Sequence, residues 1–134
     1  MSYKIFIVED HTVMQQMLQI FISRMADFEV CGAALSANQA LEELPAAAPD
    51  LVLIDMSLPR SNGAALMRSI RAQWPDLPCV FYSGHGEAIY VEQALRAGAN
   101  GYILKGEPSE LEPALQRIMA GESYLSESLH LREQ

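Results

Sequence analysis

Short apolar runs alternate along the chain with longer stretches in which apolar residues recur every three or four positions. The short runs are rich in branched side chains and are bounded by turn or helix signals, as buried parallel strands are. We expect strands to begin near residues 4, 29, 51, 78 and 101. The longer stretches predict five helices, over residues 13–25, 37–44, 64–74, 87–97 and 108–120.

The first two predicted helices have features of their own. In the first, most apolar side chains fall largely on one face, which we expect to be the buried side of an amphipathic helix: Val13, Met17, Leu18, Ile20, Phe21 and Met25. Asp10, His11 and Thr12 precede this helix as capping candidates. The second helix begins after Ser36 and is expected to be ended by Pro45 and Pro49.

Regular alternation of strands and helices predicts an α/β fold with a parallel sheet. Right-handed crossovers permit a flavodoxin-like doubly wound (βα)5 three-layer sandwich with strand order 2-1-3-4-5. In this order the switch point lies between strands one and three, and ligands bind just beyond the carboxyl ends of the strands there.

Charged residues follow three of the apolar runs, and the expected fold brings them to one edge of the sheet. They are Glu9 and Asp10, Asp55, and Lys105. Two carboxylates about 4 Å apart repel by roughly 4 kcal/mol at an effective dielectric near 20. A divalent cation, a protonated carboxyl or the lysine would relieve this repulsion. The alternative is that each charge ends its own strand in solvent.

The donor types narrow the choice of cation. Ligands that are all oxygen favour magnesium, manganese or calcium, and few carboxylates completed by waters and a phosphoryl oxygen suit Mg²⁺ best, with Mn²⁺ as the substitute. The sequence therefore predicts a metal-dependent phosphoryl-acceptor site.

Composition is that of one compact domain. The chain has 134 residues, half of them hydrophobic, and neither a long apolar stretch nor a basic leader, so we expect a cytoplasmic domain without a membrane span. A net charge of -8 argues against direct binding to nucleic acid. Cys31 and Cys79 are expected to be reduced core thiols, too far apart to form a disulfide.

Four segments occur in order at the expected strand ends: residues 8–11 (VEDH), 55–63 (DMSLPRSNG), 82–85 (YSGH) and 101–105 (GYILK). Together they resemble the receiver domain of bacterial two-component response regulators, over nearly the whole chain. A flavin-binding protein of the same topology would need a Ser/Thr/Gly-rich loop after the first strand, where this chain has two acids and a histidine.

The resemblance implies a role for each residue of the acidic edge. Asp55 would be the phosphoacceptor, forming an acyl phosphate with the phosphoryl group of a kinase phosphohistidine. Asp10 would bind Mg²⁺ directly and Glu9 through water, with Asp55 and the backbone carbonyl of Ser57 as further ligands. Lys105 would pair with a phosphoryl oxygen.

The resemblance also implies a switch. Ser83 would donate its hydroxyl to the phosphoryl group, Gly84 would leave room beside it, and Tyr102 would change rotamer, although Tyr102 also reads as an ordinary half-buried strand aromatic. Ser57 and His85 occupy positions at which, in this family, the side chain affects how long the acyl phosphate lasts. His11 follows the acid pair and could donate a hydrogen bond to it, although a histidine at the start of a helix is more often an ordinary surface residue.

Two residues depart from the family pattern. Gly106 follows the lysine where many receivers carry proline, so we expect a looser loop there. Glu9 replaces an aspartate with a side chain one methylene longer, which fits a metal contact through water.

The expected organisation is a receiver domain over residues 1–121 and a tail over 122–134. The start of the tail resembles the end of receivers of the NarL/FixJ type, where a linker and a LuxR-type helix-turn-helix domain follow. The chain is expected to be either a stand-alone receiver or a piece of a longer transcription regulator. Implied partners are a sensor histidine kinase or phosphotransfer protein, and a second copy through helix four, strand five and helix five.

Two other functions are compatible with the sequence. One is an enzyme of the haloacid-dehalogenase-like class, which also forms an aspartyl phosphate but carries a second aspartate where this chain has Ser57. The other is a receiver-like module that binds its partner without phosphorylation. A receiver is a regulatory domain that assists its own phosphorylation and dephosphorylation rather than an enzyme.

Overall fold

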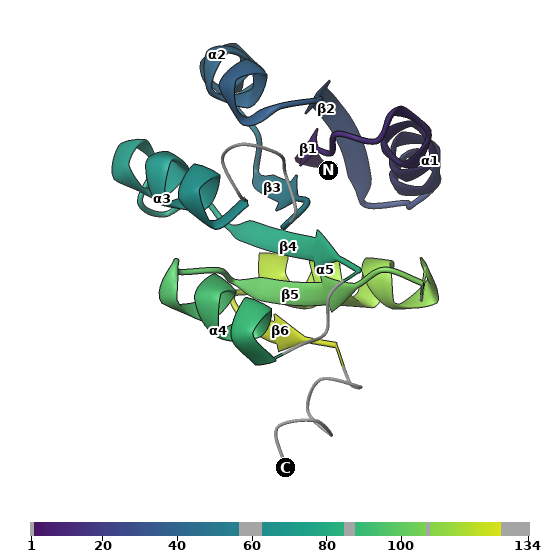
Figure 1. Ribbon diagram of the computed structural model, residues 1–134. Helices are drawn as coiled ribbons and strands as arrows, with labels where there is room; N and C mark the ends of the chain where they lie inside the picture. The colour runs from purple at the N-terminus through teal and green to yellow at the C-terminus, as the bar shows by residue number, and fades with distance from the viewer. Residues whose placement is uncertain (1, 57–62, 85–87, 107, 127–134) are drawn as a thin grey trace.

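The computed structural model describes residues 2–56, 63–84, 88–106 and 108–126. Within them, strands and helices alternate as the sequence predicts (Figure 1). The strands are β1 (Tyr3–Val8), β2 (Phe28–Ala34), β3 (Leu51–Ile54), β4 (Cys79–Ser83), β5 (Gly101–Leu104) and β6 (Tyr124–Leu125). The helices are α1 (Thr12–Ser23), α2 (Ala37–Ala47), α3 (Gly63–Gln73), α4 (Ala88–Arg96) and α5 (Leu111–Met119), with a 3-10 turn over Pro108–Glu110 before α5.

The described strands form one parallel sheet in the order β2-β1-β3-β4-β5-β6. The predicted flavodoxin-like order of the first five strands is confirmed. The sixth, β6, pairs with β5 at the edge of the sheet and was not predicted, because two residues carry too little pattern to identify a strand.

Two hydrophobic layers cover the sheet. Helices α2, α3 and α4 lie on one face and α1 and α5 on the other, as Figure 1 shows. Side chains of β1 alternate between them: Phe6 and Val8 belong to the first layer, Ile5 and Ile7 to the second. The central strands β1, β3 and β4 are therefore buried on both faces over most of their length, which is why they form continuous apolar runs, whereas β2 and β6 are partly exposed at the two edges of the sheet.

The predicted buried face of α1 is wrong at four of its six apolar residues, while Leu18 and Met25 are buried as predicted. The buried residues of the helix are Gln15, Leu18 and Ile22. Four apolar side chains expected inside are instead exposed to 38–69%: Val13, Met17, Ile20 and Phe21. A polar residue joins the core face because the Gln15 amide donates to the carbonyl oxygens of Ala34 (2.9 Å) and Glu9 (3.3 Å). α1 carries apolar residues on both its buried and its exposed side. The hydrogen bonds of Gln15 therefore decide which side faces the core.

The predicted end of α2 is also wrong. The helix continues through Pro45 to Ala47 and ends where Ala48 takes a left-handed conformation (φ 45°) and donates its N–H to Leu44 O. Proline removes one amide donor, and so close to the end of the helix this loss leaves the remaining turn in place. The predicted start of the helix is confirmed, and Ser36 caps it because the Ser36 hydroxyl accepts from Gln39 N.

A buried polar network joins β6 to the rest of the fold. Ser126 is fully buried and donates its N–H to Tyr102 O (3.0 Å). Its hydroxyl accepts from Leu104 N (2.8 Å) and donates to the Glu110 carboxylate, which also accepts from the Tyr124 hydroxyl (2.9 Å). Tyr124, Leu125 and Ser126, which belong to the expected tail, therefore extend the sheet.

Both cysteines are free thiols, as predicted. Cys31 lies on β2 and Cys79 on β4, with β1 and β3 between them. Burial raises the pKa of Cys79 to about 11, so this thiol stays protonated and unreactive at neutral pH. None of the described helices combines the length and hydrophobicity that crossing a bilayer requires.

Gly63 provides a test of packing next to the acidic edge. A Cβ on Gly63 would lie 2.6 Å from Asp55 O and 2.9 Å from Met56 Cα, both backbone atoms. Replacing Gly63 with alanine should therefore lower the free energy of unfolding by about 1 to 3 kcal/mol, the usual cost of overpacking, as measured by urea denaturation. Gly63 is the first residue of α3.

The matched control is Gly84→Ala. Among the described residues, a Cβ on Gly84 would have no neighbour within 4 Å, so this substitution should change the free energy of unfolding by less than about 0.5 kcal/mol. Equal stability of the Gly63 and Gly84 variants would contradict the close approach at Gly63.

Candidate functional site

The carboxyl ends of β1 and β3 bring the predicted acids together. Val8 lies opposite Ile54 in the sheet, so the residues that follow, Glu9 and Asp55, are neighbours. The ladder continues one step further, since Asp55 N donates to Val8 O (2.9 Å). One carboxylate oxygen each from Glu9, Asp10 and Asp55, with one ring nitrogen of His11, all lie within 4.8 Å of one another. The predicted convergence is confirmed.

These carboxylates are removed from water to different degrees. The side chains of Glu9 and Asp55 are 1% exposed, and that of Asp10 is 24% exposed. At 4.8 Å and an effective dielectric of about 20, each pair of ionised groups repels by roughly 3 kcal/mol. The fold must therefore supply positive charge or a proton at this edge.

Lys105 supplies positive charge from the end of β5. Its Nζ lies 2.9 Å from Glu9 Oε1 and 3.5 Å from Asp55 Oδ2. Its backbone N–H donates to Ser83 O (2.7 Å), which extends the pairing of β4 with β5 by one residue. Burial opposes the charged ammonium, but the hydrogen bond to Glu9 and the charge of Asp55 outweigh it, so the pKa of Lys105 is raised.

Glu9 is the most constrained of the acids. Burial raises its pKa, and the hydrogen bonds from Lys105 and from the backbone N–H of His11 oppose that rise. Both of its oxygens are engaged, because Lys105 contacts Oε1 and His11 contacts Oε2 at 3.1 Å through its backbone N–H and through Nδ1. Glu9 therefore links the acidic pair of β1 to the end of β5.

Asp10 fits a bound cation. Its Oδ1 atom is buried and accepts no hydrogen bond from any described residue. The imidazole Nδ1 of His11 lies 3.3 Å from this oxygen. A buried carboxylate oxygen without a donor is costly unless a cation or proton faces it, and oxygen donors are what Mg²⁺ prefers. Asp10, Glu9 and Asp55 are thus the described side chains suited to hold a divalent ion.

The other predicted residues lie at the same edge or outside the described part. Ser83 ends β4 and is fully buried, and the backbone of Gly84 has open space beside it. Tyr102 is fully buried, not half-buried, and its ring centroid lies 6.2 Å from that of Phe81. Ser57 and His85 lie outside the described residues.

Gln15 is a supporting residue that sequence reasoning missed. Its amide bridges the carbonyls of Glu9 and Ala34, and so fixes the chain where it leaves β1 toward α1. A sequence signal existed, since Gln15 shares a helical face with Leu18 and Ile22. A polar residue at that spacing is ambiguous until its hydrogen-bond partners are known.

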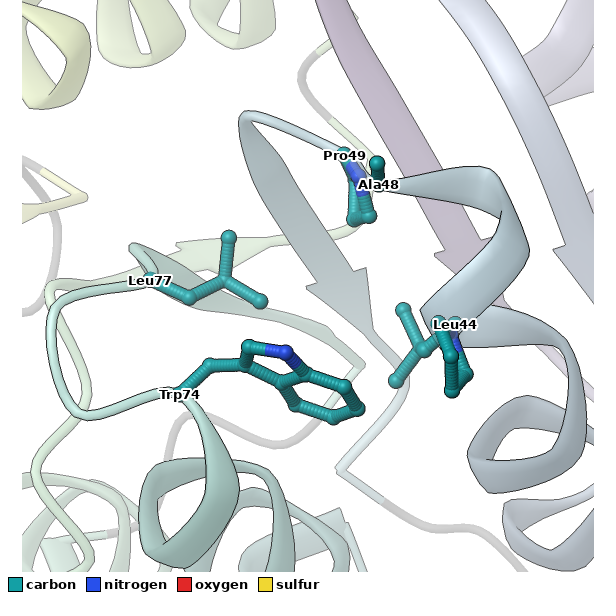
Figure 2. A pocket seen from close by; sticks show the side chains of 6 residues that line it. Leu44, Ala48, Pro49, Trp74 and Leu77 are labelled. Atoms are coloured by element: carbon teal, nitrogen blue, oxygen red, sulfur yellow. The ribbon is translucent and has the colours of Figure 1, made fainter.

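A separate apolar pocket lies at the amino ends of the strands, on the opposite side of the sheet from the acidic cluster. It has a volume of about 230 Å³ and is lined by residues that precede β3 and β4, among them Leu44, Pro49, Trp74 and Leu77. Figure 2 shows the Trp74 indole and the Leu77 side chain facing the cavity across from Leu44. The described charged cluster is at the carboxyl ends of the strands, so this pocket is not part of it.

Comparison with known proteins identifies the family. The response regulator receiver domain profile matches residues 5–116. The chain belongs to the response regulator receiver family. The receiver is similar to the chemotaxis protein CheY of Thermotoga maritima, with 31% identity over 88% of this chain and 98% of that protein. The predicted resemblance is thereby confirmed.

Several longer regulators also resemble the receiver. The DNA-binding transcriptional activator DevR/DosR of Mycobacterium tuberculosis is 34% identical over 91% of this chain and 57% of that protein. The nitrate/nitrite response regulator NarL of Escherichia coli is 34% identical over 93% of this chain and 58% of that protein. The chain thus spans less than three fifths of the length of these relatives. Its identity to them over nearly all of its own length confirms the predicted likeness to regulators of the NarL type.

Solved structures show the same fold. A two-component response regulator of the LuxR family from an Aurantimonas species matches with a TM-score of 0.93, 27% identity and coverage of 98% of this chain and 94% of that one. The receiver domain of the response regulator NarL from Mycobacterium tuberculosis matches with a TM-score of 0.83 and 26% identity over 90% of this chain and 98% of that one.

The charge balance of the site predicts how stability responds to loss of the lysine. Replacing Lys105 with glutamine leaves the buried carboxylates of Glu9 and Asp55 without their ammonium, so unfolding at neutral pH should become easier by about 2 kcal/mol or more. Because the pKa of Glu9 is raised, this carboxyl takes up a proton at a higher pH than an ordinary glutamate. The loss should therefore shrink as the pH falls through that raised pKa.

Denaturant unfolding of both proteins over a series of pH values measures this effect. The matched control is Lys4→Gln. Lys4 is the other lysine of the chain and is exposed, so its replacement removes the same charge without uncovering a buried carboxylate. A loss of stability in the Lys105 variant that did not change with pH would contradict the electrostatic account.

Proposed function

We propose that this receiver is a phosphorylation-dependent switch in which Asp55 accepts a phosphoryl group from the phosphohistidine of a sensor histidine kinase or phosphotransfer protein. One observation carries the proposal: a carboxylate oxygen of the buried Asp55 lies within 4.8 Å of oxygens of an acidic pair, and the ammonium of Lys105 is 3.5 Å from this carboxylate. Phosphoryl transfer depends mainly on positioning and charge neutralisation, and this arrangement supplies both.

Asp10, Asp55 and Glu9 are the side chains that would hold Mg²⁺, or Mn²⁺ in its place. Asp10 offers the buried oxygen that has no donor among the described residues, so it suits direct contact. Glu9 already accepts bonds at both oxygens, so it suits contact through water. The carbonyl of Ser57 is a further proposed ligand. The bound ion would neutralise charge on the phosphoryl oxygens during transfer.

In the proposed transfer, a carboxylate oxygen of Asp55 attacks phosphorus, and the P–N bond to the donor imidazole breaks. The electron pair leaves with the imidazole nitrogen, and an acyl phosphate remains on Asp55. The side chain changes from one negative charge to about two, by analogy with phosphorylated hydroxyl residues. Lys105, whose raised pKa keeps it charged, is placed to pair with a phosphoryl oxygen.

The switch would start at Ser83 and Tyr102. The Ser83 hydroxyl would donate to a phosphoryl oxygen and draw the end of β4 inward, into the space beside Gly84. Because Ser83 O accepts the backbone N–H of Lys105, such a movement would also displace the carboxyl end of β5, the strand in which Tyr102 is buried. Ser57 and His85 are proposed to tune how long the acyl phosphate lasts.

The output would be a changed surface over α4, β5 and α5, read by a partner or by a second copy of the chain. Relatives support a transcriptional output, since one is named a DNA-binding transcriptional activator. The receiver itself would not contact DNA, because its net charge of -8 repels the phosphate backbone. It would act as a regulatory domain that assists its own phosphorylation.

Incubation with acetyl phosphate and Mg²⁺ tests the proposal. Intact-mass spectrometry should show one added phosphoryl group on the native chain and none on Asp55→Asn or after chelation of the metal. The matched control is Asp76→Asn, which removes an exposed carboxylate far from the cluster in sequence and should leave incorporation unchanged.

Equal incorporation in the native chain and the Asp55 variant would overturn the assignment of Asp55. Repeated turnover of phosphate esters by the native chain would instead favour an enzyme that uses an aspartyl phosphate.

A further inference from the structure

His11 is the one member of the described cluster to which the proposed function gives no role. It stands between the acidic pair and α1, with its backbone N–H bonded to Glu9 Oε2. Its Nδ1 atom lies 3.1 Å from Glu9 Oε2 and 3.3 Å from Asp10 Oδ1. The imidazole thus faces the carboxylate oxygens that would hold the ion.

The ring is not used to cap the helix. His11 occupies the N-cap position of α1, yet its side chain makes no capping hydrogen bond. The side chain is 73% exposed while the backbone is anchored to Glu9, so the ring can rotate about its own bonds without disturbing the fold. Its position is therefore explained by the carboxylates and not by the helix.

The distances suit neighbouring ligands of one ion. In an octahedron with bonds of about 2.1 Å, adjacent ligand atoms lie about 3.0 Å apart and opposite ones about 4.2 Å. The separation between His11 Nδ1 and Asp10 Oδ1 is 3.3 Å, close to the adjacent value. The four candidate ligand atoms lie within 4.8 Å of one another, so small side-chain rotations bring His11 Nδ1 onto the same ion as Asp10 and Asp55, with Glu9 in contact through water.

The chemistry of the donor then affects which ion binds. Mg²⁺ is hard, prefers oxygen and keeps several of its waters, so it gains little from an imidazole. First-row transition ions accept imidazole nitrogen readily, and their affinity rises from Mn²⁺ to Ni²⁺. A nitrogen beside Asp10 therefore favours the transition ions selectively.

We propose that His11 Nδ1 is an additional ligand of the metal site and makes the site select imidazole-binding transition ions over Mg²⁺. The proposal rests on the proposed function for the existence of the metal site, and it adds the residue that sets ion preference. Glu9 would lose one of its two contacts to His11 when the ring turns to the ion, and would keep the one from the backbone N–H.

Calorimetric titration of the tag-free chain with Mg²⁺, Mn²⁺ and Ni²⁺, without phosphoryl donor, tests the proposal. His11→Ala and His11→Gln should each weaken Ni²⁺ binding by about tenfold or more and Mn²⁺ binding by less, while the affinity for Mg²⁺ changes less than about twofold. The matched control is His130→Ala, the same substitution at another histidine, which should leave all three affinities unchanged.

Pulsed electron paramagnetic resonance of bound Mn²⁺ gives a second readout. The native chain labelled with ¹⁵N at histidine should show a nitrogen nucleus coupled directly to the ion, and His11→Ala should not. An unchanged Ni²⁺ to Mg²⁺ affinity ratio in both His11 variants, or no coupled nitrogen, would overturn the role of His11 alone. If the native chain bound none of the three ions, the metal site of the proposed function would fail with it.

Discussion

The site depends on one electrostatic constraint: two carboxylates that are almost inaccessible to water share a single ammonium. Glu9 and Asp55 come from the ends of β1 and β3, and Lys105 reaches them from the end of β5. Charges from three separate segments can meet in this way only if the strands lie in the observed order. The interaction therefore ties the chemistry to the topology, and a change in strand order would leave unpaired charge in the interior.

Backbone hydrogen bonds set this geometry more firmly than the side chains do. Asp55 is held by its N–H bond to Val8, and Lys105 by its N–H bond to Ser83, each one residue beyond its strand. The sheet beneath is buried on both faces, so it cannot relax to separate the charges. The acids are thus held close together although they repel one another. The binding of a cation or a phosphoryl group changes the electrostatic energy of the site.

The strands and their charged ends could be predicted because burial on both faces leaves a continuous apolar run that stops where the chain meets the site. Three other features could not. The rotation of α1 is decided by hydrogen bonds of Gln15 to distant carbonyls, α2 tolerates Pro45 near its end, and β6 is too short to show a period. Each depends on partners remote in sequence, which local pattern does not encode.

The glycine after Lys105 shows how the fold holds the lysine without a proline at that position. Gly106 has a φ of 103°, a conformation that favours glycine, so the chain can turn sharply there. The preceding residues are fixed from both sides of β5, since Lys105 N–H bonds to Ser83 O and Leu104 N–H bonds to the Ser126 hydroxyl. The position of the lysine is therefore determined by β4 and β6 and does not require a rigid residue after it. The short sixth strand, which the sequence did not predict, thus helps to hold the charge on which the site depends.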